Sequence, residues 1–210
     1  MFLLRFLYAP DAIFELTRTY NADPVAYKVN VEQGTYNLEG DGNPWILPAV
    51  RSAKEKIKDS NHEYLPILEL PSFRTLAMNL VFGKSSAAVR EERVASCQAL
   101  SGTGALYIAG TMLKETLGRG TNNYRQVVES IEEGDCVGYV HFRPIPITAA
   151  VTSSLARMIL VEIFKPPSYG ARIVAAILED EEIYAQWRKD LVMMSSRIAE
   201  MRRGLYQWLI

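Results

Sequence analysis

The sequence is poor in the residues that disulfide frameworks, metal sites and membrane spans require. Its 210 residues include two cysteines and two histidines, which excludes a disulfide framework and a histidine-rich metal site. Cys97 and Cys136 have no CxxC partner, and we interpret them as core thiols in a reducing compartment. No stretch approaches about 18 uninterrupted apolar residues, so no transmembrane helix is expected. Arg5 interrupts the apolar start, and Pro10 and Asp11 follow it, so we predict no signal peptide and a cytoplasmic location.

The sequence also has no large excess of charge of either sign. The chain carries 23 basic and 24 acidic side chains, a formal net charge of −1, which argues against nucleic-acid and membrane-surface partners. With 49% hydrophobic and 22% charged residues, the composition is that of a soluble globular protein, and a disordered tail, a collagen-like fibre and a coiled coil are excluded. The length predicts one domain or two small ones.

Hydrophobic periodicity and turn residues predict a mixture of helices and strands. Helices are expected over residues 11–20, 48–59, 72–82, 101–118 and 179–210, the third with Ser72 as its N-cap. Strands are expected over 27–36 and 93–100, and loops over 39–44, 61–67 and 118–123. Residues 143–148 predict a proline-rich turn, 153–164 a helix running into a strand, and 165–174 a turn that leads into a helix. The charged positions of 48–59 are interpreted as a solvated helix face.

The most informative local pattern is a predicted strand followed by small residues that open a helix. Ser101, Gly102, Thr103 and Gly104 stand at this turn, where unpaired backbone N–H groups, the helix dipole and two hydroxyls favour a phosphate. An ordinary tight turn between a strand and a helix is the alternative. The pattern matches neither the dinucleotide fingerprint nor a Walker A loop. On local evidence Tyr64, in the loop HEYLP, is a packed rim tyrosine.

Four stretches, taken in order, resemble the aspartate aminotransferases of the cytosolic animal type. They are KVNVEQGTYNLEGDGNPWILPAVRSAKEKI, NHEYLPI, ALSGTGAL and PPSYGARIVAAIL. Residues 11–123 follow the family almost continuously, and residues 153–205 resume it after a gap. The resemblance implies an α/β chain with a partial pyridoxal-phosphate transferase fold of type I. That fold would keep a remnant of the mixed, mostly parallel sheet, its flanking helices and part of the small domain.

The resemblance also implies a division into domains. Residues 1–44 would form the N-terminal arm and the start of the small domain, and 45–172 a remnant of the large cofactor-binding domain, with 124–152 unmatched. Residues 173–210 would form the long interdomain helix and a remnant of the small domain. In the family this helix links the two domains, and here it would begin near Ile173 and continue through Trp187.

The cofactor that the resemblance implies is pyridoxal 5'-phosphate. Ser101, Gly102 and Thr103 would hold its phosphate, together with Tyr64 from the neighbouring subunit. Gly34 would lie beside the substrate carboxylate. The implied partners are a second subunit, in a homodimer or in a heterodimer with a full-length aminotransferase, and the implied substrates are a dicarboxylic amino acid and a 2-oxo acid.

Several functional residues of the family have no counterpart in the sequence. The string Ser-x-x-Lys-Asn-x-Gly-Leu-Tyr, which carries the lysine that forms the Schiff base, is absent. The residues around the cofactor ring and the arginine that clamps the substrate α-carboxylate are missing too. Leu160 stands where the family has the arginine that reads the side-chain carboxylate. Of the lysines present, Lys165, before Pro166, is the least unsuited to the missing role, and we do not expect it to form a Schiff base.

Three functions stay open at this point. The chain would be a shortened aminotransferase relative that is inactive alone, a transaminase that completes its site in another way, or a non-enzymatic partner or regulator of a full-length subunit. The missing lysine favours the first and third over the second. Because the loss of neighbouring strands would expose edges and apolar surface, we also expect low stability or aggregation of the isolated chain.

Overall fold

The computed structural model describes residues 12–28, 34, 36–37, 43–61, 63–117 and 145–209. The chain divides into two units, Met1–Ile46 and Leu47–Ile210. The first contains helix α1 (Ala12–Ala22), which confirms the predicted helix at 11–20, and an isolated antiparallel bridge between Asn37 and Pro44. Most of the expected strand at 27–36, all of the loop at 118–123, and Cys136 lie outside the described residues.

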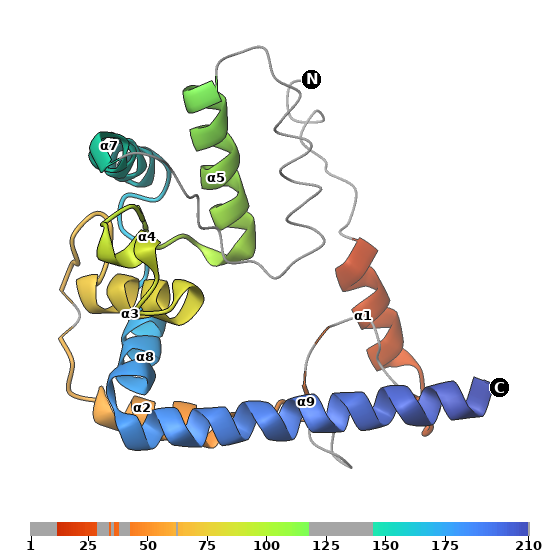
Figure 1. The fold of residues 1–210 in the computed structure, drawn as a ribbon. Coiled ribbons are helices and arrows are strands. Elements are labelled where there is room, and N and C mark those ends of the chain that lie inside the picture. The colour runs from red at the N-terminus through yellow and green to blue at the C-terminus, as the bar shows by residue number, and fades with distance from the viewer. Residues whose placement is uncertain are drawn as a thin grey trace, which may run out of the picture. The chain divides into compact units, whose positions relative to one another are not determined.

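Helices make up the second unit (Figure 1). They are α2 (Pro48–Lys56), α3 (Pro71–Phe82), α4 (Ala87–Arg90), α5 (Ser101–Leu117), α7 (Ile145–Glu162), α8 (Ser168–Glu179) and α9 (Glu181–Leu209). The helices predicted at 48–59, 72–82, 101–118 and 179–210 are thereby confirmed. None of the described helices is long and apolar enough to cross a membrane.

Some predicted elements are wrong in type. Within the expected strand at 93–100 only Val94 is in a β-bridge, and the described residues contain no longer strand there. The described residues therefore do not confirm the mixed sheet. The proline-rich segment 143–148 already belongs to α7 from Ile145 onward, since a proline in the first turn of a helix interrupts no hydrogen bond. Residues 153–162 are helical throughout, without a strand.

Ser72 is not the N-cap of α3. The helix begins one residue earlier, at Pro71, and its N-cap position is occupied by Leu70, whose side chain makes no capping bond. Proline is accepted there because its fixed φ suits a helix and its missing N–H would have no partner. The helix ends before Gly83, whose φ of 80° is the left-handed conformation in which helices commonly stop.

Two helices take the place of the single long helix expected from Ile173 through Trp187. Asp180 separates α8 from α9 with an extended backbone, φ −95° and ψ 118°. Its carboxylate caps α9 by accepting the N–H groups of Glu182 at 3.0 Å and Ile183 at 3.1 Å. Lys56 forms an ion pair of 2.8 Å with the same carboxylate, and this contact, with the backbone donors, lowers the pKa of Asp180.

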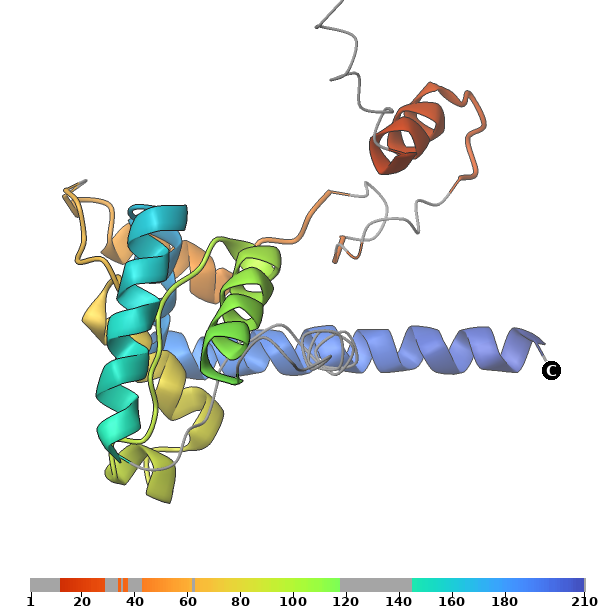
Figure 2. The same cartoon turned by 90° about the horizontal axis from the view of Figure 1, so that it is seen from above.

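Two small apolar cores hold the second unit together, and Figure 2 shows from above the helices that form them. One lies between α5, α7 and the extended segment before α5, and its buried members are Ala95, Ile108, Met112, Val151, Leu155, Met158 and Ile159. The other joins α2, α8 and the start of α9 through buried Ala53, Ala176 and Ile177, with Trp187 packed against them. Alanines in the second core let the helices approach closely.

A buried carboxylate ties α9 to α2. Asp190 is 2% exposed, and its Oδ2 accepts the backbone N–H of Ala49, in the first turn of α2, at 3.0 Å. Its Oδ1 accepts a hydrogen bond of 2.7 Å from Gln186. The N-cap residue of α2 is Leu47, which makes no side-chain cap, so a residue 141 positions away supplies the acceptor. A negative charge there also interacts favourably with the helix dipole.

Glu69 is buried in an unfavourable conformation. It is fully buried, its φ is 82°, and its Oε1 has no hydrogen-bond partner among the described residues. Burial raises the pKa of this carboxyl, against the opposing effects of the Leu70 N–H and the charge of Arg172. A non-glycine residue in the left-handed region costs about 1–2 kcal/mol. Glu69 therefore combines backbone strain with an incompletely satisfied buried acid.

We predict that Asp190→Ala lowers the free energy of unfolding by about 2–3 kcal/mol, because a buried N–H and the Gln186 amide lose their acceptor. Asp190→Asn keeps one acceptor oxygen, and the expected loss is about half as large. Urea unfolding followed by far-UV circular dichroism measures both. The neighbouring exposed Lys189→Ala is the control, and an equal effect of Lys189→Ala and Asp190→Ala would contradict the capping role.

We predict that Glu69→Gly stabilises the protein at pH 7 by about 1–3 kcal/mol, because it removes both the strain and the buried carboxylate. Glu92, exposed with a φ of 51°, provides a matched control, since Glu92→Gly relieves the backbone alone. A carboxyl with a raised pKa contributes stability below its ordinary pKa of 4.5 that is lost as the pH rises through the folded-state value. The advantage of Glu69→Gly should therefore grow with pH above 4.5, and an advantage independent of pH would contradict the role of the buried carboxylate.

Candidate functional site

The predicted phosphate turn lies at the start of α5. Ser101 is the first residue of this 17-residue helix, and Ser101 and Thr103 are exposed. The N–H of Gly104 already donates to the carbonyl of Leu100 at 3.0 Å. In a first turn the preceding N–H groups have no intrahelical acceptor, so the positions Ser101 to Thr103 offer three backbone donors and two hydroxyls.

Ser101 has a φ of 57°, the left-handed conformation, which non-glycine residues adopt at a cost of about 1–2 kcal/mol. Strained backbone is found preferentially at binding and catalytic sites. Phe164, at the end of α7, is a second non-glycine residue with positive φ, at 66°. Both residues lie in turns that carry predicted site residues or their contacts.

The turn after α7 connects two segments that the sequence singled out. Lys165 donates to the carbonyl of Leu65, in the HEYLP loop, at 2.9 Å. Two residues later, the carbonyl of Pro167 accepts from the side chain of Gln98 at 2.9 Å, three positions before the phosphate turn. The loop at 61–67 and the segment leading into α5 are therefore both fixed to this one turn.

Tyr64 is presented on the surface of the second unit. Its side chain is 78% exposed, and its ring meets that of Phe164 edge to face with centroids 6.1 Å apart. The ammonium of Lys165 lies 5.3 Å from the centroid of the Tyr64 ring. No hydrogen bond or ring contact of the described residues joins Tyr64 to Ser101, Gly102 or Thr103, so the structure does not bring these predicted site residues together within one chain.

Lys165, the lysine least unsuited to forming a Schiff base, makes contacts of another kind. Besides Leu65 and Tyr64, its ammonium lies 5.8 Å from the centroid of the Phe164 ring. A carbonyl acceptor and aromatic faces are the partners of an ammonium group, whereas a lysine that attacks a carbonyl must be a neutral amine. The geometry gives Lys165 a structural role in holding the HEYLP loop.

The two remaining predicted positions carry little local information. Gly34 belongs to the first unit, is exposed, and has open space around it, because a Cβ added there would meet no atom within 4 Å. Leu160, which the resemblance was expected to place at the position of an arginine, is 43% exposed on α7. Among the described residues, no group of three or more His, Cys, Asp or Glu side chains could hold a metal ion.

Sequence reasoning missed a small cavity of about 40 Å³ between the segment 95–99, α5 and α7. Its lining includes Ala95, Cys97, Ala99, Ala105 and Ile108. Burial raises the pKa of the Cys97 thiol to about 11, although the nearby charge of Arg74 opposes this. The thiol is therefore protonated and unreactive at neutral pH, which agrees with its interpretation as a core residue.

The charged face of α2 is exposed to solvent and also lines a hollow in the surface. Lys54 and Lys58 are exposed, as predicted, but they line a hollow of about 490 Å³ together with Arg172 and Tyr169 of α8. Lys58 pairs with Glu55, and Arg172 donates to Asn61 at 3.1 Å. No residue predicted for the phosphate site lines this hollow. Only the packing of α8 beside α2 could reveal it.

Comparison with known proteins identifies the relatives of the chain. It is 28% identical to the cytoplasmic aspartate aminotransferase of Saccharomyces cerevisiae, in an alignment that covers 97% of this chain and 80% of that enzyme. The solved structure of the yeast enzyme matches with a TM-score of 0.79 at 27% identity, over 97% of this chain and 81% of that one. The chain is therefore similar to aspartate aminotransferases over nearly its whole length. No protein-family model matches it.

The similarity to these aminotransferases is uneven along the chain. With the cytoplasmic aspartate aminotransferase of Gallus gallus, identity rises to 43%, over 117 residues that make up 54% of this chain and 28% of that enzyme. The alignment with the yeast enzyme is 334 positions long, and this chain has 210 residues. At least 124 positions of that alignment therefore have no residue of this chain. Members of the family use pyridoxal phosphate.

We predict that Lys165→Met loosens the HEYLP loop without unfolding the protein. The loop would lose its hydrogen bond at Leu65 and the contact with the Tyr64 ring, which together are worth about 1–2 kcal/mol locally. Hydrogen exchange of the peptide covering residues 63–68 should become faster, while the midpoint of global unfolding changes little. Lys84→Met, an exposed lysine after α3, is the control. Unchanged exchange in Lys165→Met would contradict the positioning role.

Proposed function

We propose that this chain is an aspartate aminotransferase-like protein that keeps the phosphate-binding turn of the family and does not catalyse amino transfer by itself. The family reaction moves an amino group between L-aspartate and 2-oxoglutarate. The observation that carries the proposal is the absence of a lysine in the family's Ser-x-x-Lys-Asn setting anywhere in the 210 residues. At least 124 positions of the alignment with the yeast enzyme have no residue of this chain. Such a lysine would be expected among them.

The residues present fit the phosphate end of the cofactor. Ser101, Gly102 and Thr103 combine a helix N-terminus, three backbone donors and exposed hydroxyls, the features that bind phosphate groups. The strained φ of Ser101 supports a binding role for this turn. When bound, pyridoxal phosphate supplies an electron sink for the amino-acid substrate. Within this chain the role of the turn is to bind and orient its phosphate.

The described lysines do not support covalent attachment. Lys165 is held by Leu65 and by two aromatic rings. Lys54, Lys56 and Lys58 are exposed on or beside α2, and Lys189 is exposed on α9. Leu160 cannot form the bidentate pair with a carboxylate that the family arginine makes. Recognition of a dicarboxylic substrate would therefore lack one of its main determinants.

A second candidate function is pairing with a full-length aminotransferase subunit in the cytoplasm. The exposure of Tyr64 favours it, because this is the position that reaches a neighbouring subunit's phosphate site in the family. The Lys165 and Phe164 contacts hold the tyrosine in place on the surface. The chain would then contribute a tyrosine to its partner's site, and co-purification with a full-length subunit that weakens in Tyr64→Ala would support this role.

We predict that pyridoxal phosphate binds reversibly, that borohydride reduction labels no lysine, and that aspartate and 2-oxoglutarate are not turned over. Thr103→Ala should weaken binding about tenfold, because a hydrogen bond to a charged phosphate is worth about 1.5–3 kcal/mol. Thr75→Ala, at an exposed position of α3, should leave binding unchanged. Binding is measured by equilibrium dialysis, and labelling by mass spectrometry of tryptic peptides.

The possible outcomes separate the two parts of the proposal. A labelled lysine together with turnover would overturn the proposed lack of activity. Absence of binding, or equal affinity of Thr103→Ala and the unaltered chain, would overturn the phosphate-binding role. Competition by inorganic phosphate, but not by pyridoxal, would assign the interaction to the phosphate group.

A further inference from the structure

The hollow beside α2 gathers positive charge that the proposed function does not use. Its volume is about 490 Å³, and it is lined by α2, the turn that follows α2 and the start of α8. Four of its lining side chains are cationic and one is acidic: Arg51, Lys54, Lys58 and Arg172 against Glu55. The hollow therefore has three more positive than negative side chains, in a chain whose formal net charge is −1.

The spacing of the residues explains how this charge is gathered. Ala53 turns one side of α2 into the core that α2 shares with α8. Arg51, Lys54 and Lys58 follow one another in steps of three and four residues, so they share the other side. Because α8 packs beside α2, Arg172 of α8 lines the same hollow. The cations thus come from two elements that are far apart in the sequence.

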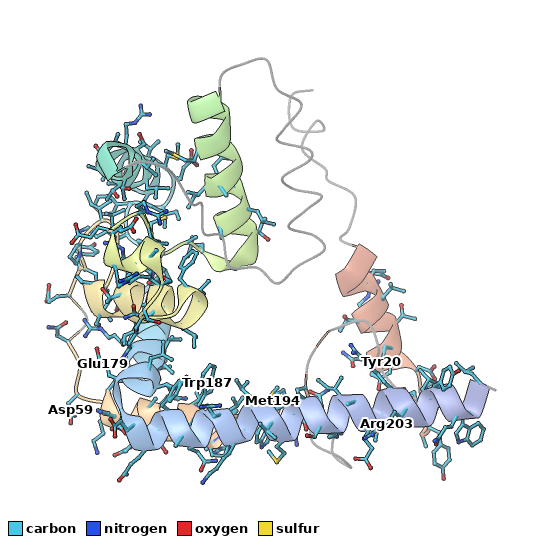
Figure 3. The ribbon with its side chains drawn as sticks, viewed as in Figure 1. Tyr20, Asp59, Glu179, Trp187, Met194 and Arg203 are labelled. Carbon is cyan, nitrogen blue, oxygen red and sulfur yellow. The ribbon has the colours of Figure 1, made fainter. Side chains whose placement is uncertain are left out.

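Acidic partners neutralise only part of the charge. Lys58 pairs with Glu55, the one acid that lines the hollow. Asp59, which lies just beyond α2 in Figure 3, is exposed and does not line it. The ion pairs among the described residues do not include Lys54, whose side chain is exposed. An ammonium group is therefore available to a ligand in the hollow.

Arg172 is held in place beside this ammonium group. Its Nη2 donates to Oδ1 of Asn61 at 3.1 Å, which joins α8 to the turn after α2. Its Nε is buried and has no hydrogen-bond partner among the described residues. The charge of Arg172 acts on the carboxyl of Glu69, but that carboxyl is buried and does not line the hollow. A guanidinium that is already positioned loses little conformational freedom when an anion binds to it.

The start of α8 adds backbone donors to the cations. The helix has 12 residues, its N-cap residue Pro167 makes no side-chain cap, and its first turn contains no acidic residue. The N–H groups of Ser168 and Tyr169 have no intrahelical acceptor in this first turn, and both residues line the hollow. The Ser168 hydroxyl is a further donor, and the positive end of the helix dipole favours an anion at the same place.

These groups specify the chemistry of a ligand. Guanidinium, ammonium, hydroxyl and backbone N–H groups are the donors from which phosphate oxygens accept hydrogen bonds. A single phosphate would meet only part of a hollow of about 490 Å³ whose cations lie on both α2 and α8. We propose that this hollow binds an oligophosphate, a ligand with at least two linked phosphate groups. The site is separate from the phosphate turn at Ser101, since no residue predicted for that turn lines the hollow.

Isothermal titration calorimetry of the full chain with inorganic pyrophosphate tests the site. Lys54→Gln should weaken binding about tenfold, because it removes a charged hydrogen bond to phosphate. Arg172→Gln should weaken it at least as much. Lys189→Gln removes the same charge from an exposed position of α9 outside the hollow, and it should change the dissociation constant by less than about twofold. Equal weakening by Lys54→Gln and Lys189→Gln would overturn the proposal.

Two further comparisons test the class of ligand and the place where it binds. Orthophosphate and citrate should bind at least about tenfold more weakly than pyrophosphate, and equal affinity for either would overturn the choice of an oligophosphate. Thr103→Ala should leave the affinity for pyrophosphate unchanged, whereas a loss equal to that in Lys54→Gln would overturn a site separate from the phosphate turn. Failure of pyridoxal phosphate to bind would contradict the proposed function alone, and failure of pyrophosphate to bind would contradict this site alone.

Discussion

The carboxylate of Asp190 is the interaction on which the arrangement of α2, α8 and α9 depends. It satisfies the first turn of α2, whose own N-cap residue provides no acceptor, and it does so from the middle of a helix that also packs against α8. The small buried side chains of Ala49 and Ala53 bring the helices close but specify no register, because apolar contacts are not directional. A hydrogen bond to one backbone N–H does specify it. The start of α9 is therefore fixed along α2.

The turn after α7 has a comparable part in the candidate site. Lys165 and Pro167 each bond to a segment distant in the sequence, so the HEYLP loop and the approach to α5 share one anchor. This arrangement positions an exposed tyrosine and an exposed phosphate turn without joining them. In the proposed pairing with a second subunit, that subunit would supply the missing half of the site.

Local patterns were sufficient to predict most of the helices. Apolar spacing located α1, α2, α3, α5 and α9, and the small residues after Leu100 located the turn that opens α5. Elements whose form depends on distant partners were predicted less well. The segment 93–100 has the composition of a strand, yet only Val94 is in a β-bridge, because a full strand requires a neighbour along its length. The Asp190 cap, the strained Glu69 and the anchoring role of Lys165 arise from tertiary contacts, which no local pattern records.

Asp180 is the single residue that makes α8 and α9 two helices, and its backbone torsion has a consequence for the shape of the whole unit. With a helical ψ near −42° in place of 118°, residues 168–209 would form one continuous rod. A straight rod could not turn back along α2, so Trp187 and Asp190 would be carried away from Ala53 and Ala49. The contacts of the Asp180 side chain with Lys56 and with the first turn of α9 therefore hold the backbone of this residue in its extended conformation. Rotation about ψ at this one residue therefore separates two packed helices from one continuous helix that would not contact α2.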